Sequence, residues 1–227
     1  MPEIEVSHLT KDYGSGRGVF DVSLEVERGE RFGFLGPNGA GKTTTIRHLM
    51  GFSRPQAGTV AIHGQDCWTR SAELQRTVGY LPGEIALPAG MTGTAFLRMM
   101  ERMRGVRDDE HLKMLLDTFR LDPDIPTREM SLGVKRKMAV VTAFMHDPDI
   151  LILDEPTSGL DLGSMRTVAA LVRRLADEGR AVLVVTHDLE FIGQACDKAV
   201  RVEAGRIAAE AVVEGDLQAV RELLAKG

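Results

Sequence analysis

Apolar and polar residues alternate along much of the first part of the chain, which is the pattern of strands with one covered face. Ile4 and Val6, for example, stand between acidic and hydroxyl-bearing neighbours. Arg31–Leu35 is instead a short, mostly apolar run that stops at a glycine, which indicates a more buried strand. The elements predicted in this part are strands over residues 3–9, 22–26, 31–35 and 60–63 and a helix over residues 44–51.

The middle of the chain changes to a helical period. Apolar residues such as Leu97 and Met100 recur at helical spacing within Thr94–Arg104, and the same spacing returns within His111–Arg120. A segment of this kind, lying between two parts that contain strands, is typical of an insertion into a sheet. Residues 85–145 are therefore predicted to form a helical insert.

The last third returns to strands and helices in alternation. Ile150–Leu153 and Ala181–Thr186 are almost entirely apolar, and a helix with one apolar face is expected between them over Ser164–Glu178. Apolar strands separated by helices indicate a parallel sheet covered on both faces. The other predicted features are a hairpin of Val200–Glu203 and Arg206–Ala209 about Ala204–Gly205, and a final helix capped by Asp216 and carrying Leu217, Val220, Leu223 and Leu224.

Length, charge and cysteine spacing limit the number of domains and the partners that the sequence predicts. The 227 residues suffice for one large domain, and we expect a single domain over residues 1–227. The net charge of −5 gives the whole chain no electrostatic footprint for nucleic acid. Cys67 and Cys196 lack metal-binding spacing, which fits a reducing cytosol, and the first residues show no signal-peptide pattern. No apolar run approaches the roughly 20 residues that span a bilayer, so a membrane role requires a partner.

A candidate phosphate-binding loop lies directly after the predicted strand Arg31–Leu35. Residues Gly36–Thr43 read Gly-Pro-Asn-Gly-Ala-Gly-Lys-Thr and satisfy the spacing G-x-x-x-x-G-K-[ST]. Glycines let successive backbone N–H groups meet phosphate oxygens, and the following helix offers its unpaired N–H groups and positive dipole end. Lys42 adds a point charge for the β- and γ-phosphates, and Thr43 offers a hydroxyl to Mg²⁺. The loop by itself predicts a nucleoside triphosphate and no particular reaction.

Two adjacent acids, Asp154 and Glu155, follow the apolar strand Ile150–Leu153. The carboxyl ends of the strands are where ligands bind in doubly wound sheets, so these acids are expected beside the phosphate loop. Asp154 can hold Mg²⁺ directly or through water, and Glu155 can polarise the attacking water as a general base. The pair therefore predicts hydrolysis of the triphosphate.

The order of the motifs makes the sequence similar to the ATP-binding subunits of ABC transporters over residues 3–213. Besides the phosphate loop, four segments resemble the motifs of that family: Val78–Glu84, its magnesium-contacting segment; Met130–Lys137, its signature L-S-G-G-Q; Asp154–Asp161, its acid pair with the loop after it; and Thr186–Asp188, with its switch histidine. The resemblance implies the fold of an α/β P-loop NTPase of the ABC type. That fold has a mostly parallel core sheet flanked by helices, an N-terminal antiparallel β subdomain and the helical insert.

The resemblance also implies ATP and Mg²⁺ as ligands and assigns roles to individual residues. Glu155 and His187 are catalytic, and Thr43 and Asp154 hold the metal. Tyr13 stands where the family has an aromatic ring that stacks on adenine. The residues assigned to the nucleotide are Tyr13, Gly36, Pro37, Asn38, Gly39, Ala40, Gly41, Lys42, Thr43, Thr44, Ser131, Gly133 and Asp161.

The signature segment implies a second subunit. In the family it binds the γ-phosphate of the ATP held by the opposite subunit, and here Ser131 and Gly133 offer hydrogen-bond donors at a helix start. A homodimer is therefore expected, in which ATP binding closes two subunits face to face and hydrolysis releases them. The basic triplet Lys135–Lys137 is interpreted as a solvated helix face rather than a nucleic-acid contact.

Two segments depart from the family pattern. Gly83 stands where the family usually has Gln, with Glu84 next to it, and glycine has no side-chain oxygen for magnesium. Either Glu84 or water fills this position, or the coupling of the catalytic site to the transport partner is altered. The signature carries Leu132 and Val134 where Gly and Gln are usual.

The leading interpretation is an ATPase that docks on a separate integral membrane permease at the cytoplasmic face, through the helical insert and the segment Gly79–Glu84. The divergent signature resembles that of bacterial drug exporters, which favours export. The alternative is a soluble ABC ATPase that acts on nucleic acid or ribosomes, although such proteins usually carry two cassettes or a long coiled-coil insertion. A third possibility, a regulatory module with little hydrolysis, is opposed by the presence of Glu155 and His187.

Overall fold

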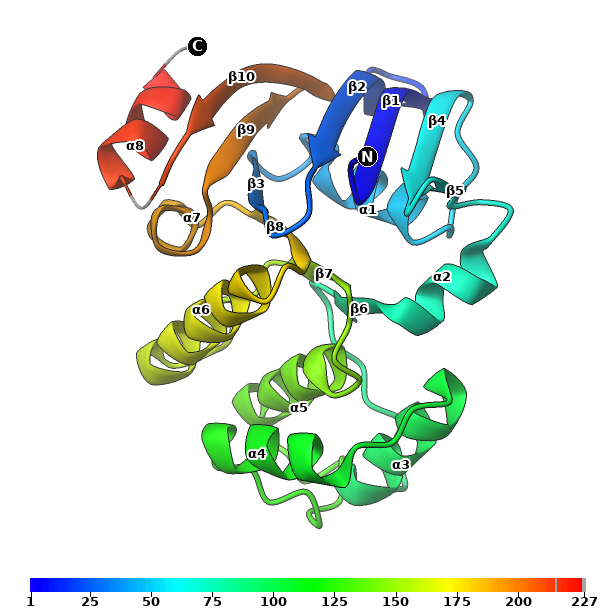
Figure 1. The fold of residues 1–227 in the computed structure, drawn as a ribbon, viewed down its shortest axis with the longest axis vertical. Coiled ribbons are helices and arrows are strands. Elements are labelled where there is room, and N and C mark those ends of the chain that lie inside the picture. Colours follow the sequence, from blue (N-terminus) through cyan, green and yellow to red (C-terminus); the bar gives the residue numbers. More distant parts are fainter. Residues whose placement is uncertain (215, 226–227) are drawn as a thin grey trace.

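The computed structural model describes residues 1–214 and 216–225, except for the side chains of residues 224 and 225. Figure 1 shows the strands of two sheets in the upper part of the view and a group of helices, α3, α4 and α5, below them. Among the described residues, no helix is long and apolar enough to cross a membrane.

The first sheet is antiparallel and comes from the N-terminal part of the chain. Its strand order is β2-β1-β4-β5, and β1 pairs with both β2 and β4. Alternate residues of these strands, such as Ile4 and Val6, are buried, while their neighbours face outward, as the alternating pattern predicts. The strands are β1 (Ile4–Asp12), β2 (Gly18–Val26), β4 (Ala57–Ile62) and β5 (Gln65–Asp66).

The second sheet is mostly parallel, in the order β10-β9-β3-β8-β7-β6. Only β10 runs antiparallel, against β9, in the hairpin predicted from the sequence. The strands are β3 (Arg31–Leu35), β6 (Val78–Leu81), β7 (Ile150–Asp154), β8 (Ala181–Thr186), β9 (Lys198–Glu203) and β10 (Arg206–Val212). The α/β fold class predicted from the sequence, with its antiparallel N-terminal sheet, is confirmed.

Both faces of the parallel sheet are covered, which explains why its strands are apolar throughout. In β7, Ile150 and Ile152 face α1 (Lys42–Leu49) and the antiparallel sheet, whereas Leu151 and Leu153 face α5 (Leu132–Phe144) and α6 (Leu162–Asp177). The helix that follows the phosphate loop is therefore held between the two sheets, with its first turn at the carboxyl end of β3.

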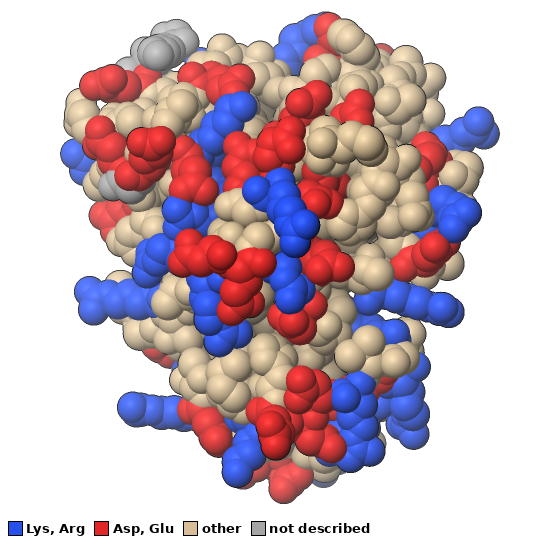
Figure 2. Space-filling model, viewed as in Figure 1, with Lys and Arg blue, Asp and Glu red and all other residues tan. Residues whose placement is uncertain are grey.

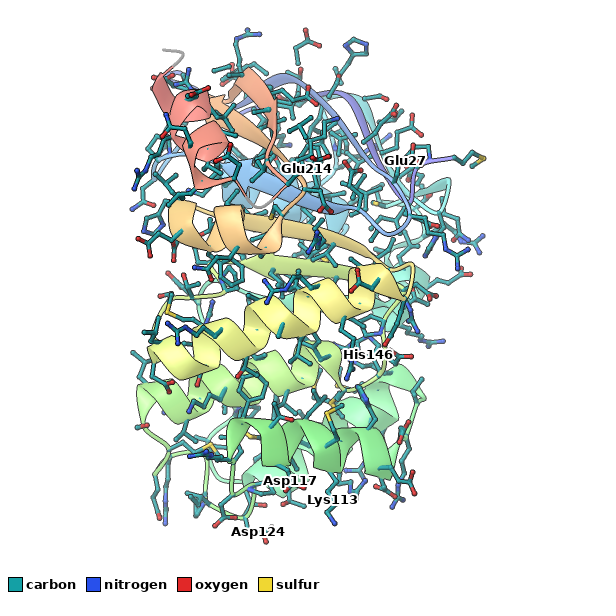
Figure 3. The ribbon with its side chains drawn as sticks, turned by 60° about the vertical axis from the view of Figure 1, so that its left-hand side comes forward. Glu27, Lys113, Asp117, Asp124, His146 and Glu214 are labelled. Carbon is teal, nitrogen blue, oxygen red and sulfur yellow. The ribbon has the colours of Figure 1, made fainter. Side chains whose placement is uncertain are left out.

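The predicted helical insert contains α3 (Gly93–Arg104), α4 (Asp109–Phe119) and α5. Thr92 caps α3 by accepting a hydrogen bond from the Ala95 N–H, and Asp108 caps α4 in the same way. Lys113 and Asp117 point away from the body of the molecule at the lower edge of Figure 3, so α4 presents one polar face outward.

Several elements differ from the sequence-based predictions. The helix expected over residues 44–51 begins two residues earlier, at Lys42, and the strand expected at residues 60–63 begins at Ala57. Elements that were not predicted are β5, β6, α2 (Ser71–Thr77) and α7 (Leu189–Ala195). These elements are short, so periodicity carries little information about them.

The final helix is present as predicted. Helix α8 (Leu217–Ala225) begins after Asp216, whose Oδ1 accepts a hydrogen bond from the Gln218 N–H at 2.7 Å. Val220 and Leu223 are buried against α7 and the end of the parallel sheet. The side chain of Leu224, also expected on the apolar face, lies outside the described residues.

Candidate nucleotide-binding site

The phosphate loop joins β3 to α1 with a backbone that only glycine permits at its tightest points. Gly39 and Gly41 have φ values of 82° and 107°. A Cβ on Gly41 would lie 2.8 Å from Val19 Cγ1, so no side chain fits there. The residue before helix α1, Gly41, provides no side-chain cap, and no acidic residue lies in the first turn of the helix. Its first N–H groups are therefore available to an anion.

The C-terminal hairpin supports this loop from behind. The Gly205 N–H, in the turn between β9 and β10, donates to the Ala40 carbonyl at 3.0 Å. The Gly205 carbonyl in turn accepts from the Phe20 N–H of β2 at 2.7 Å. These hydrogen bonds connect the phosphate loop, the β9–β10 turn and β2, which are distant in the sequence. The loop is thereby fixed between the antiparallel sheet and the last two strands.

Lys42 is 6% exposed and extends back along its own loop. Its Nζ donates to the carbonyls of Gly36 at 2.6 Å and Pro37 at 3.2 Å, and lies 3.7 Å from Glu155 Oε1. The ammonium charge is thereby placed between the loop and the acid pair, which is where a polyphosphate bound to the loop needs a cation.

Asp154 lies buried at the end of β7, next to Glu155. Burial raises the pKa of the Asp154 carboxyl to about 6, and the neighbouring charge of Glu155 adds to the increase, whereas Lys42 opposes it. A cation between this carboxylate and a triphosphate would favour the ionised form.

Glu155 adopts a left-handed conformation, with φ of 49°. Its N–H donates to the Val185 carbonyl of β8 at 2.7 Å, and its carboxylate accepts from Thr186 Oγ1 at 2.8 Å. His187 Nδ1 lies 3.0 Å from Glu155 Oε1. The acid is therefore oriented by the end of the neighbouring strand, and His187 is exposed beside it.

These groups line one cavity of about 1040 Å³, which brings the phosphate loop and the acid pair together. Tyr13, half exposed, lies at its wall. The predicted site residues that line this cavity are Tyr13, Asn38, Gly39, Gly41, Lys42, Thr43, Thr44, Asp154 and Glu155. Gly36, Pro37 and Ala40 shape the loop without lining the cavity, and His187 lies in a separate recess beside Glu155.

The donor set fits Mg²⁺. Thr43 offers a hydroxyl oxygen and Asp154 a carboxylate oxygen to the same cavity. Within the part of the chain that the structure describes, no group of three or more His, Cys, Asp or Glu residues is placed to hold a metal ion. Mg²⁺ suits such a site because it usually takes one or two protein oxygens together with substrate phosphates and water. Glu84, next to Gly83, also lines the cavity.

The signature residues lie elsewhere, at the surface. Ser131 caps α5 by accepting a hydrogen bond from the Val134 N–H at 3.3 Å, and Leu132 beside it is 71% exposed. A Cβ on Gly133 would lie 3.5 Å from the Gly159 carbonyl, so this segment contacts the loop after the acid pair. None of these residues lines the cavity of its own chain.

Asp161 also lies outside the cavity and has structural partners. It caps α6 by accepting from the Ser164 N–H at 2.8 Å, and it forms an ion pair with Lys137 Nζ at 3.0 Å. These hydrogen bonds hold the pKa of the Asp161 carboxyl well below its usual range. The structure thus places Asp161 on the same surface as the signature segment.

The interpretation of the basic triplet as a solvated face is wrong for Arg136. This side chain is 3% exposed and points inward, while Lys135 and Lys137 are partly exposed. Sequence reasoning also missed Arg17 and Arg47, which line the cavity. Arg47 follows Thr43 by four residues in α1 and so lies on the same helix face, which could have indicated it. No pattern in the sequence marks Arg17.

A glycine loop ahead of a helix, a buried lysine on that loop, and an acid pair at the end of another parallel strand of the same sheet define a phosphate-loop nucleoside triphosphatase. The comparisons with known proteins narrow this class. The family model for ABC transporters matches residues 19–158. The Nod factor export ATP-binding protein I of Cupriavidus metallidurans is 34% identical, over 91% of this chain and 70% of that protein. The daunorubicin/doxorubicin resistance ATP-binding protein of Streptomyces peucetius is 37% identical, over 91% of this chain and 64% of that protein.

Solved structures agree with these sequence matches. The structure of an ATP-binding subunit of an ABC transporter superposes with a TM-score of 0.90 at 29% identity and covers 98% of both chains. A dimeric ATP-binding cassette bound to ADP and phosphate shares the fold, with a TM-score of 0.83 at 21% identity, over 93% of this chain and 99% of that chain. The chain belongs to the ABC transporter family and is an ATP-binding cassette ATPase of that family.

Proposed function

We propose that this chain acts as one ABC ATPase domain in a pair of identical copies, which bind and hydrolyse ATP to drive export through a separate membrane permease at the cytoplasmic face. The names of the similar proteins, which refer to Nod factor export and to drug resistance, support export. The chemistry would be hydrolysis of the γ-phosphate, because the acid pair lies against the phosphate loop.

Different residues of the cavity would bind the phosphates, hold the metal ion and accept the proton. Lys42 and the N–H groups of α1 would hold the β- and γ-phosphates. Mg²⁺, held by Thr43 and Asp154, would supply positive charge against the phosphates. Glu155 would take a proton from the attacking water, and the hydrogen bonds from Thr186 and His187 orient its carboxylate for this role.

The observation that carries the proposal is the placement of two anion-facing segments on different surfaces. The phosphate loop faces the cavity, whereas Ser131 and Gly133 lie outside that cavity at the exposed start of α5. Leu132 and Leu162, large apolar side chains beside the signature and after Asp161, are 71% and 62% exposed. A second copy, turned to face the first, would cover these side chains and bring its signature to the bound triphosphate.

A groove between the parallel sheet and the helical insert is the proposed docking site of the permease. This apolar groove, a cavity of about 460 Å³, is defined by Tyr80, Pro82, Ile85, Phe96 and Met100, with Ala139 and neighbouring residues completing its wall. It contains the segment around Gly79–Glu84 and part of the insert, where the sequence predicts docking. An apolar groove of this size suits a short helix of a membrane protein.

The charge distribution gives less support to the alternative function, in which the protein acts on nucleic acid. The chain carries a net charge of −5. On the face shown in Figure 2, acidic and basic side chains are mixed over the whole surface, without a continuous basic area. Binding to a phosphate backbone depends on such an area, and we therefore favour transport over the nucleic-acid alternative.

The test is the substitution Glu155→Gln, which removes the general base and leaves Lys42 and the loop intact. We expect this variant to bind ATP, to lose turnover and to accumulate as a dimer in gel filtration with MgATP. The unsubstituted chain, which hydrolyses its ATP, serves as the control. The same variant, purified from membranes, is expected to carry a multi-span membrane protein with it.

Two results would contradict the proposal. An E155Q variant that binds ATP and elutes only as a monomer argues against the paired site. Co-purification with ribosomes or DNA, and not with a membrane protein, supports the alternative function.

A further inference from the structure

The buried side chain of Arg136 joins two segments that belong to different parts of the site. Its Nη1 donates to the carbonyls of Pro82 at 2.8 Å and Gly83 at 3.0 Å. Its Nη2 donates to the Asp154 carbonyl at 3.0 Å and to the Glu155 carbonyl. One planar guanidinium therefore holds the segment after β6 with one nitrogen and the acid pair with the other.

Such a side chain is costly to bury, which argues that filling space is not its only role. Arg136 is 3% exposed, and its Nε is buried without a hydrogen-bond partner among the described residues. A buried cation costs several kcal/mol unless its hydrogen bonds are satisfied. An apolar side chain of similar length would fill the same volume without this cost, so the four carbonyl contacts are what arginine adds here.

Gly83 brings the same segment directly against the acid pair. A Cβ at Gly83 would lie 3.1 Å from Asp154 Oδ2 and 3.3 Å from Asp154 Cγ. The segment therefore reaches Asp154 through its main chain, at the position where the side chain of another residue would occupy the space.

The segment borders both cavities. Tyr80 and Pro82 line the nucleotide cavity on one side and the apolar groove on the other. A displacement of Pro82 by a helix docked in the groove would therefore shift the carbonyls that Arg136 binds. Because Glu155 has a positive φ, its orientation depends on the hydrogen bonds at both of its peptide groups. Its carbonyl accepts from Arg136 Nη2 and from the Ser158 N–H at 3.1 Å, and Arg136 is the donor that also reaches residues 82 and 83.

We propose that Arg136, together with the peptide of Gly83, is the link through which occupation of the apolar groove sets the position of Asp154 and Glu155. Arg136 is a positioning residue, because it touches the backbone of the acids and not the reacting atoms. The inference rests on the proposed function for the identity of the groove's occupant. All the contacts that form the link lie within this chain, so the link can be tested without a permease.

The first experiment separates positioning from nucleotide binding. In Arg136→Met we expect kcat to fall roughly 100-fold, since small misplacements of catalytic groups have effects of this size. The KM for ATP should stay within about twofold, because the phosphate loop and Lys42 are untouched. Arg173 provides the matched control: it also donates to a backbone carbonyl, that of Gln194 at 2.8 Å, and it lines neither cavity. Arg173→Met should keep both constants.

The second experiment reads the link directly, by hydrogen exchange in the Glu155→Gln background. Coupling between two sites is reciprocal, so MgATP in the nucleotide cavity should change the exchange of residues 85–87, which line the groove and not that cavity. We expect this change in E155Q and its loss in E155Q/R136M, with ATP binding retained. If R136M loses its cooperative thermal transition, Arg136→Lys replaces it in both experiments. Lysine keeps the charge but cannot bind the two pairs of carbonyls through two separate nitrogens.

A double-substitution cycle adds a third measurement. Gly83→Ala alone should lower kcat, because its Cβ meets Asp154. If Arg136 and Gly83 act as one link, R136M/G83A should lower kcat no further than the worse single variant. Three results would each overturn the inference. They are a double variant whose reduction in kcat is the product of the two single reductions, an unchanged kcat in both Arg136 variants, and an exchange response that persists without Arg136.

Gel filtration of the same E155Q samples tests the paired site separately. A protein that stays monomeric but shows the exchange response would contradict the paired site and still support the link through Arg136.

Discussion

Two helices of this molecule begin at segments proposed to face phosphate, and they begin in different ways. Helix α1 starts after Gly41, which has a left-handed conformation and provides no side-chain cap, and its Lys42 is buried. Helix α5 starts after Ser131, whose hydroxyl caps the helix, and its Leu132 is exposed. The first helix leaves its N–H groups available inside a cavity, whereas the second partly satisfies its own and lies at the surface.

The difference shows how the two halves of the site are completed. The start of α1 is enclosed by its own chain, through β2 and the turn at Gly205. The start of α5 is a stable helix end that needs no ligand for its own structure. A contact between this end and a nucleotide therefore depends on another surface, which is why the proposed function requires a second copy.

The strongest test of this comparison is Ser131→Asp in the Glu155→Gln background. Aspartate caps helices as well as serine does, so the stability of α5 should be retained. Its negative charge would face the γ-phosphate of the other copy, and like charges in an interface cost several kcal/mol. We expect the MgATP-dependent dimer to weaken by about 100-fold or more, measured by analytical ultracentrifugation.

The control is Ser131→Asn, which also caps the helix but carries no charge. This variant should keep most of the dimer. If Ser131→Asp dimerises as well as its parent, the start of α5 does not face a phosphate, and the two helix ends differ for structural reasons alone.

A smaller effect is expected at the start of α1. Lys42→Ala removes a charged donor from the loop, a loss of about 1.5–3 kcal/mol, or roughly 10- to 100-fold in ATP affinity. Isothermal titration of the monomer with MgATP measures it. Lys113→Ala, on the outer face of α4 in Figure 3, removes the same charge far from the loop and should leave the affinity unchanged. Equal affinity of both variants would refute the assigned phosphate site.

The smallest effect is expected at Tyr13, the residue predicted to stack on the adenine ring of ATP. Tyr13→Ala should weaken ATP binding by about 1 kcal/mol, roughly fivefold, because stacking on one ring contributes this much. Tyr13→Phe keeps the ring and should bind as the unsubstituted chain does. Inorganic triphosphate, which has no base to stack, should bind both variants equally. A loss of triphosphate binding in Tyr13→Ala would show that the substitution disturbs the loop rather than the stacking.

The sequence predicted best what short-range patterns determine. The bounds of β3 and β8 agree with the predicted Arg31–Leu35 and Ala181–Thr186, because each is an apolar run between turns. The phosphate loop and the acid pair meet at one cavity because both lie at carboxyl ends of parallel strands of one sheet, β3 and β7, with β8 between them. Their spacing in the chain is large, but the topology of a parallel sheet makes the meeting predictable.

The inward orientation of Arg136 could not be predicted in the same way. Helix α5 is buried on nearly all sides from Met138 to Phe144, so it has no clear polar face from which the direction of one basic residue could be read. The four carbonyls that Arg136 binds come from residues 82–83 and 154–155, and only the tertiary structure brings them together. The same applies to α2 and β5, whose few residues are ordered by their neighbours rather than by their own pattern.

The hairpin turn at Gly205 has a consequence for the biosynthesis of the protein. Synthesis proceeds from the N-terminus, so Gly36–Thr43 leaves the ribosome long before β9 and β10, which pair beside β3 and hold the loop through Ala40. A nascent chain that has not reached Gly205 carries the whole phosphate motif without its support. Competence to bind nucleotide is therefore acquired only after Gly205 has been made, about 160 residues later than the phosphate motif itself.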